Sequence, residues 1–104
     1  MNNMFNNCFS LSSLNLSNFK INNVTFMKNI FTYLDNLTSL DLSNFNNKIR
    51  DMNGMFYNCS SLTSLNLSNF NANKFTTIWC MFYNINKCCN LICHDNQILN
   101  EFKK

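Results

Sequence analysis

One ten-residue phrase occurs three times in this chain of 104 residues, and no other feature limits its possible folds as strongly. It reads SLSSLNLSNF at 10–19, NLTSLDLSNF at 36–45 and SLTSLNLSNF at 61–70. Around it, the pairs MF, IF, MF and MF begin at positions 4, 30, 55 and 81. Self-similarity at a period of roughly 20–50 residues is typical of arrays in which one small structural unit is repeated.

Each unit changes its apolar period once. In the third unit, Leu65 and Leu67 flank a polar residue, which is the pattern of a strand with one buried face. In the spacer that precedes the second phrase, Val24, Met27 and Phe31 recur at steps of three and four residues, as on one side of a helix. We therefore expect each unit to consist of a short strand, a polar turn and about two helical turns.

A single unit of this kind cannot bury its own apolar edge, whereas stacked neighbours share a continuous core. The sequence thus predicts an α/β repeat, a solenoid with a short parallel sheet on one side and short helices on the other. A small helical array is the alternative, but the L-x-L alternation at the same place in each copy argues against it. We expect three full repeats and a degenerate fourth in residues 1–93, with units starting near 4, 30, 55 and 81.

The last eleven residues, 94–104, are expected to form a capping segment. Asp95 or Asn96 has the short polar side chain that favours the start of a helix. Such a helix would turn Ile98, Leu99 and Phe102 onto the open edge of the core.

The unit MFYNCSSLTSLNLSNFNANKFTTIWC, residues 55–80, resembles the repeats of BspA-type leucine-rich repeat surface proteins. The likeness covers about residues 1–93 and is most specific in NLSNF at 15–19, DLSNF at 41–45 and NLSNF at 66–70. The resemblance implies a leucine-rich-repeat-like fold. It also implies an extracellular or cell-surface protein whose repeats serve adhesion or protein contact, without enzymatic activity.

The beginning of the chain lacks the features of a secreted precursor. MNNMFNNCFS has neither a charged region nor an apolar run, so no signal peptide is predicted. Met1 stands in the column of Met27 and Met52, which suggests a fragment that begins inside an array. We expect such a fragment to self-associate through its N-terminal repeat edge, because an uncovered edge invites pairing with another chain.

Composition and charge exclude two classes of partner. Charged residues make up only 12% of the chain, the net charge is +3, and the cations cluster only as a terminal pair, so nucleic-acid binding is not expected. There is no run of about 18 apolar residues, so no membrane-spanning segment is predicted. Asn makes up nearly a quarter of the chain, and a low-GC genome would explain much of that bias.

The six cysteines do not predict a disulfide framework. Cys8 and Cys59 share a column but lie two units apart, which places their Cα atoms ~10 Å from each other at ~4.8 Å per strand. A disulfide needs Cα atoms within about 7 Å. We therefore interpret both as small buried hydrophobic residues.

The C-terminal cysteines raise the question of a metal site. Structural zinc sites usually show paired C-x₂₋₄-C spacings. Here two of the cysteines occupy leucine columns of the repeat, so neither a metal nor another cofactor is predicted. Cys88 and Cys93 fall in leucine columns and are expected to point inward, with Cys89 and His94 pointing elsewhere. His94 is the only histidine and belongs to no recognisable catalytic motif, so no catalytic residues are predicted. The alternative metal site would use Cys80, Cys88, Cys89, Cys93 and His94.

The positive clue is the outward side of the strands, where alternation places rows of small polar residues opposite the core. The predicted partner-binding residues are Ser13, Asn15, Ser17, Ser39, Asp41, Ser43, Ser64, Asn66 and Ser68. In the fourth unit Asn90, Ile92 and His94 continue these rows. Plain solubility is the competing explanation. The rows lack the Trp, Tyr and Arg anchors of tight interfaces, so binding is expected to be weak and multivalent.

The sequence thus favours a non-enzymatic interaction or adhesion module that binds a protein or a host or cell-surface ligand. Two alternatives remain open. One is an intracellular cysteine-rich scaffold with a metal-stabilised C-terminal end, and the other is a purely structural spacer array.

Overall fold

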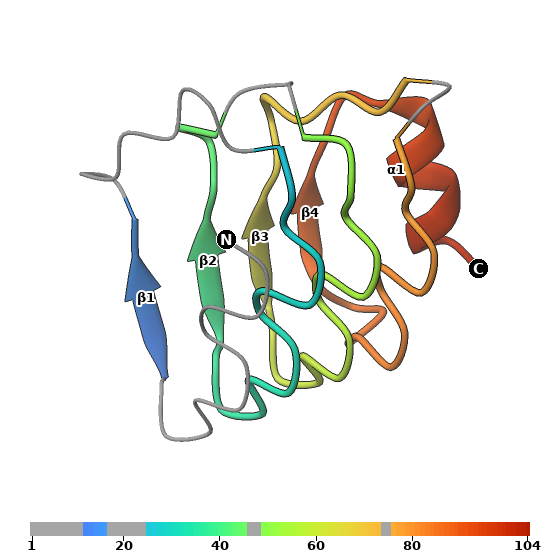
Figure 1. Ribbon diagram of the computed structural model, residues 1–104. Helices are drawn as coiled ribbons and strands as arrows, with labels where there is room; N and C mark the ends of the chain where they lie inside the picture. The colour runs from blue at the N-terminus through green and yellow to red at the C-terminus, as the bar shows by residue number, and fades with distance from the viewer. Residues whose placement is uncertain (1–11, 17–24, 46–48, 74–75) are drawn as a thin grey trace.

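The computed structural model describes residues 12–16, 25–45, 49–73 and 76–104, and the structural statements below concern these residues. In them the chain forms four strands, β1 Ser13–Asn15, β2 Ser39–Asp41, β3 Ser64–Asn66 and β4 Asn90–Ile92. They are followed by a single helix, α1 Asn96–Phe102. The strands form one parallel sheet in the order β1-β2-β3-β4, so each unit lies beside its sequence neighbours (Figure 1). The predicted α/β class and parallel pairing are confirmed.

The register follows the leucine columns of the sequence. Leu40 pairs with Leu14 on one side and with Leu65 on the other, and Leu65 pairs with Leu91. The strands are three residues long, shorter than the repeated phrase suggests. They end early because the side chains of Asp41 and Asn66 accept hydrogen bonds from main-chain N–H groups two residues ahead, at 2.9 and 3.0 Å. Such local bonds turn the chain away from the sheet.

The core lies between the sheet and the turns that connect its strands. Leucines from the strand columns fill it from one side, and a column of phenylalanines fills it from the other. Phe56 stacks between Phe31 and Phe82, with ring centroids 5.7 Å away in each direction. Phe45 and Phe70 form a second stack at 6.1 Å. The second, third and fourth units therefore contribute equivalent phenylalanines to one column, and the second and third to another.

The prediction of short helices opposite the sheet is wrong. Residues 27–34, 52–59 and 78–85 form successive turns instead, and α1 is the only helix in the described part of the chain. Every fourth residue in these segments has a positive φ near 60°, which an α-helix of L-residues does not accommodate. The positive-φ positions are Asn29, Tyr33, Gly54, Asn58, Cys80 and Asn84.

The turns also direct their main-chain N–H groups outward to the next unit. In the second unit, Met27, Asn29, Phe31 and Tyr33 donate to carbonyls of the third unit over 2.8–3.1 Å. In the third unit, Met52, Gly54, Phe56 and Asn58 donate to carbonyls of the fourth over 2.8–2.9 Å. We call this set of bonds the turn ladder. It replaces the internal hydrogen bonds of a helix, so the units are joined along both the sheet and the turns.

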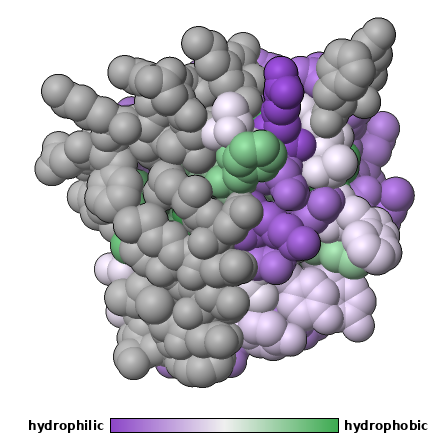
Figure 2. All heavy atoms as spheres, in the orientation of Figure 1, coloured by the Kyte–Doolittle hydropathy of each residue, from purple (hydrophilic) through white to green (hydrophobic). Residues whose placement is uncertain are grey.

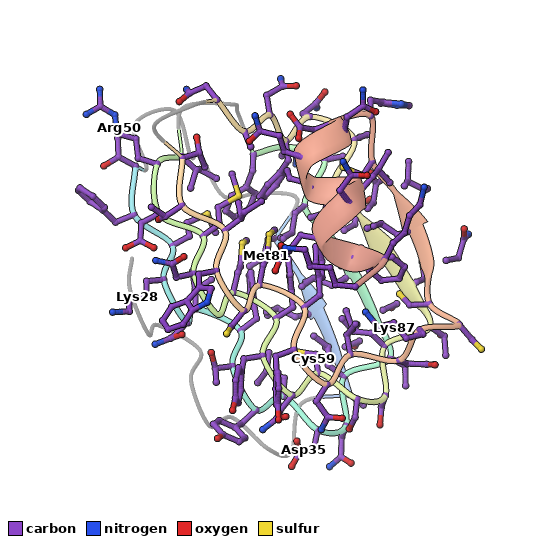
Figure 3. The ribbon with its side chains drawn as sticks, turned by 90° about the vertical axis from the view of Figure 1, so that its right-hand side faces the viewer. Lys28, Asp35, Arg50, Cys59, Met81 and Lys87 are labelled. Carbon is purple, nitrogen blue, oxygen red and sulfur yellow. The ribbon has the colours of Figure 1, made fainter. Side chains whose placement is uncertain are left out.

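Helix α1 covers part of the fourth unit. Asp95 caps it by accepting a hydrogen bond from the Ile98 N–H at 3.0 Å. Asp95 is one of the two residues that the sequence proposed for the start of this helix. Ile98 is fully buried, and the ring of Phe102 packs edge-on against Phe82 at 5.3 Å. Seen from that end, α1 lies in front of the fourth unit (Figure 3). The helix therefore closes the end of the core beside β4.

No helix in the described ranges combines the length and apolar character needed to cross a membrane.

Candidate functional site

The outward side of the sheet presents the polar rows expected from the sequence. Ser39, Asp41 and Ser64 are exposed, while Leu40 and Leu65 between them are buried. A shallow hollow of about 550 Å³ lies across all four strands on this side. It is lined by Ser13, Leu14, Ser39, Leu40, Asp41, Ser64, Asn66 and Ile92. We call this the sheet face.

The nine candidate residues do not all share this surface. Five of them line the hollow, and Asn15 belongs to β1. Ser43 and Ser68 lie outside the strands and are half-buried, because the chain turns immediately before them. Neither of them lines the hollow, and their role in binding stays a prediction. Ser17 lies outside the described residues.

The electrostatics of the sheet face depend on Asp41, which is the only ionisable side chain among the residues that line the hollow. Hydrogen bonds from the side chain and main chain of Ser43 lower the pKa of Asp41 below its ordinary value. The carboxylate is therefore ionised at neutral pH. Around it are hydroxyls and an amide, so the hollow suits a ligand that forms hydrogen bonds.

Two threonines tie adjacent strands together just before the sheet face, and sequence reasoning missed them. The hydroxyl of Thr38 donates to the Ser12 carbonyl at 3.3 Å, and that of Thr63 donates to the Thr38 carbonyl at 3.0 Å. Their recurrence one residue before β2 and β3 was the available signal. These hydroxyls have structural partners, so the exposed serines are the better candidates for external contacts.

An aromatic row on the turn side was also missed. The ring centroids of Tyr33 and Tyr57 are 5.6 Å apart, and those of Tyr57 and Tyr83 are 4.7 Å apart. Desolvation, together with the neighbouring tyrosines, raises the pKa of Tyr57. Near this row, Trp79 is 77% exposed. The side seen in Figure 2 is mainly hydrophilic or intermediate in hydropathy over its described residues, with small hydrophobic areas.

The cysteines have unequal environments. Cys59 is fully buried and its thiol donates to the Phe31 carbonyl at 2.9 Å. Burial raises the pKa of Cys59 to about 12. Burial also raises the pKa of Cys89 and of Cys93. Cys8, the proposed column partner of Cys59, lies outside the described residues.

The expected orientation of the adjacent pair Cys88 and Cys89 is wrong. Cys88 is exposed and Cys89 is buried, because the fourth unit turns one residue later than the others. The side chain of Asn86 accepts from the Cys88 N–H and its carbonyl accepts from the Cys89 N–H, both at 3.0 Å. Within the described ranges, no three His, Cys, Asp or Glu side chains lie close enough together to hold a metal ion.

The sequence matches the model of a known protein family. The family described as "Mycoplasma protein of unknown function, DUF285" matches residues 1–97. The chain belongs to this family. No curated protein and no solved structure matches the chain significantly.

We predict that thiol alkylation will follow these environments in this DUF285 chain. Of the five cysteines that the structure describes, Cys88 should react with iodoacetamide first, because it is exposed, and Cys59 and Cys89 should react last, because they are buried. Mass spectrometry of peptides after timed alkylation measures the order. Labelling in denaturant is the control and should make the rates similar. Early labelling of Cys59 in the native protein would contradict its position in the core.

Proposed function

We propose that the chain is a non-enzymatic interaction module, a leucine-rich-repeat-like solenoid fragment of a surface-exposed protein that binds through its sheet face. The observation that supports this most directly is the hollow across all four strands, whose exposed side chains on β1, β2 and β3 are short and polar, with Ile92 exposed on β4. Short side chains lose little conformational entropy on binding. The parallel register repeats a serine followed by Asn or Asp on β1, β2 and β3.

The affinity of a single sheet face should be low. Its described residues include no Trp, Tyr or Arg, which dominate tight interfaces. Several copies on one surface would raise the overall affinity without any new contact, because later binding events become intramolecular. This favours adhesion through many weak contacts to a protein or a host or cell-surface ligand. The cell-surface location rests on the resemblance of the repeats to BspA-type proteins.

Site-specific photo-crosslinking tests this proposal. A photoreactive residue at Ser39 or Ser64, both exposed on the sheet face, should form an adduct with the same partner when the protein is displayed in multiple copies. The matched control is Ser60, a serine that is exposed in the turn before β3 and does not line the hollow. An excess of unlabelled multivalent protein should compete for the partner and reduce the amount of adduct.

Equal crosslinking from Ser64 and Ser60, or none from the sheet face in intact cells and host extracts, would contradict binding through that face. The competition step separates specific adducts from chance collisions. Labelling of intact cells with a membrane-impermeant reagent tests the proposed location separately.

A further inference from the structure

The outer edge of the fourth unit carries a row of main-chain N–H groups that have no acceptor among the described residues. They belong to Ile78, Cys80, Phe82 and Asn84. The corresponding groups in the preceding unit all donate to carbonyls of the fourth unit in the turn ladder. The edge therefore offers donors in a regular row. Exposed edges of this kind are templates for pairing with another chain.

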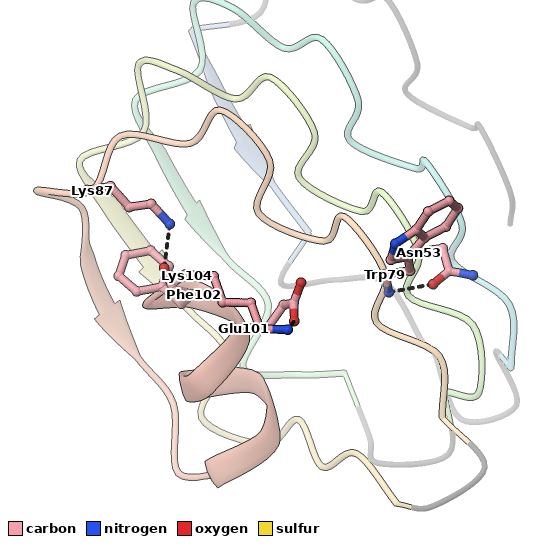
Figure 4. Close-up of polar contacts among 6 residues, drawn as sticks. All are labelled: Asn53, Trp79, Lys87, Glu101, Phe102 and Lys104. Atoms are coloured by element: carbon pink, nitrogen blue, oxygen red, sulfur yellow. Dashed lines mark hydrogen bonds and ion pairs between the residues drawn. The ribbon is translucent and has the colours of Figure 1, made fainter.

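A hollow of about 360 Å³ lies beside this edge, between the turns of the fourth unit and α1. Trp79 and Tyr83 line one part of it, and Lys87, Glu101 and Lys104 line another. Trp79 is 77% exposed. The equivalent position in the third unit holds the polar residue Asn53, whose side chain accepts a hydrogen bond from the Trp79 N–H at 2.6 Å (Figure 4). Exposed Trp and Tyr are the side chains that most often anchor protein interfaces.

Helix α1 limits what this edge accepts. Phe102 packs on Phe82 at 5.3 Å, where the phenylalanine of a further stacked unit would lie. A complete unit, including the end of a second copy of this chain, therefore cannot stack on the core while α1 is in place. The hollow beside Cys80, Phe82 and Asn84 separates this part of the row from the helix, which leaves room there for a single segment.

The charge around the edge indicates the chemistry of that segment. Lys87 and Lys104 face the hollow, and Glu101 is its only acidic lining residue. Glu101 is paired with Lys104 at 3.0 Å, while the Lys87 ammonium donates to the Phe102 carbonyl (Figure 4). The unpaired N–H dipoles add further positive potential. The site is thus complementary to carbonyl oxygens and carboxylates.

We propose that an acidic, extended segment of a partner protein adds to this edge beside residues 78–84. Its main-chain carbonyls accept the four N–H bonds, its acidic side chains face Lys87 and Lys104, and an apolar side chain contacts Trp79. Main-chain pairing of this kind is a common mode of peptide recognition. The site is separate from the sheet face, so it stands independently of the proposed function.

The test uses the whole 104-residue chain and an acetylated, amidated hexapeptide of alternating Glu and Val. Trp79 is the only tryptophan, so its fluorescence reports on this site alone. We expect a blue shift with a Kd on the order of 10–100 µM, as suits a small interface. Amide resonances of Ile78, Cys80, Phe82 and Asn84 should move downfield, whereas those of Met52 and Phe56 should stay unchanged.

Three controls make the result decisive. The hexapeptide with Lys in place of Glu should bind at least tenfold more weakly. Lys104→Glu should weaken binding of the acidic peptide about 3- to 10-fold, and Lys103→Glu, outside the hollow, by less than about twofold. Equal binding of both peptides, no response at millimolar concentration, or amide shifts at Ser39 and Ser64 instead would overturn the proposal.

Discussion

Replacing Phe56 with alanine is expected to lower the free energy of unfolding by about 3–5 kcal/mol, the usual range for a buried phenylalanine. Phe56 is fully buried and lies between Phe31 and Phe82 with nearly parallel rings, at interplanar angles of 4° and 11°. Its removal leaves a cavity in the middle of the column. The turn ladder fixes the main chain on both sides, so the neighbours have little freedom to close it.

Chemical denaturation followed by circular dichroism measures this loss. Phe26→Ala is the matched control, because Phe26 is 53% exposed, and it should cost less than about 1 kcal/mol. A loss below about 1 kcal/mol for Phe56→Ala would mean that the units do not share a continuous core. An equal loss for both variants would point to a general dependence on aromatic residues and not to the column.

The sheet was predictable because its signal is local and repeated. Leu40 and Leu65 occupy the same place in two copies of one phrase, and only parallel stacking in register buries both. The turn side was not predictable in the same way. Apolar residues at steps of three and four are typical of a helix, but a chain of turns with a positive φ at every fourth residue produces the same steps. Asn58 and Asn84 at such positions were the available signal.

The asparagine content needs a structural explanation as well as a compositional one. Asn tolerates positive φ better than most residues, which suits Asn29, Asn58 and Asn84 to the turns. Asn66 has another role, since its side chain accepts from the Ser68 N–H and ends β3. A codon bias can supply asparagine, but the fold uses it at particular positions.

The two candidate sites differ in how far they could be predicted from the sequence. Strand alternation predicts that Ser39 and Ser64 face outward, and they do. It cannot predict that β2 ends before Ser43, since that turn depends on a side-chain contact of Asp41. The donor row of the fourth unit was beyond sequence reasoning, because a helical spacer would have used its N–H groups internally.

Gly54→Ala should destabilise the protein by about 2–4 kcal/mol through two separable effects. Gly54 has a φ of 61°, and an L-residue in the left-handed region costs roughly 1–2 kcal/mol. A Cβ built on Gly54 would also lie 2.2 Å from the side-chain oxygen of Asn29. The main chain has little room to move, since the Gly54 N–H donates to the Trp79 carbonyl and its carbonyl accepts from Thr32 at 2.9 Å.

A double-mutant cycle with Asn29→Gly separates the two effects. Glycine at position 29 tolerates the local φ of 56° and removes the side chain that a new Cβ would meet. In that background Gly54→Ala should cost only the conformational part, about 1–2 kcal/mol. An unchanged cost would mean that the Asn29 side chain simply moves aside in the single variant. A cost below about 0.5 kcal/mol in both backgrounds would contradict the left-handed conformation of Gly54. It would also contradict the description of residues 52–59 as turns joined by the turn ladder.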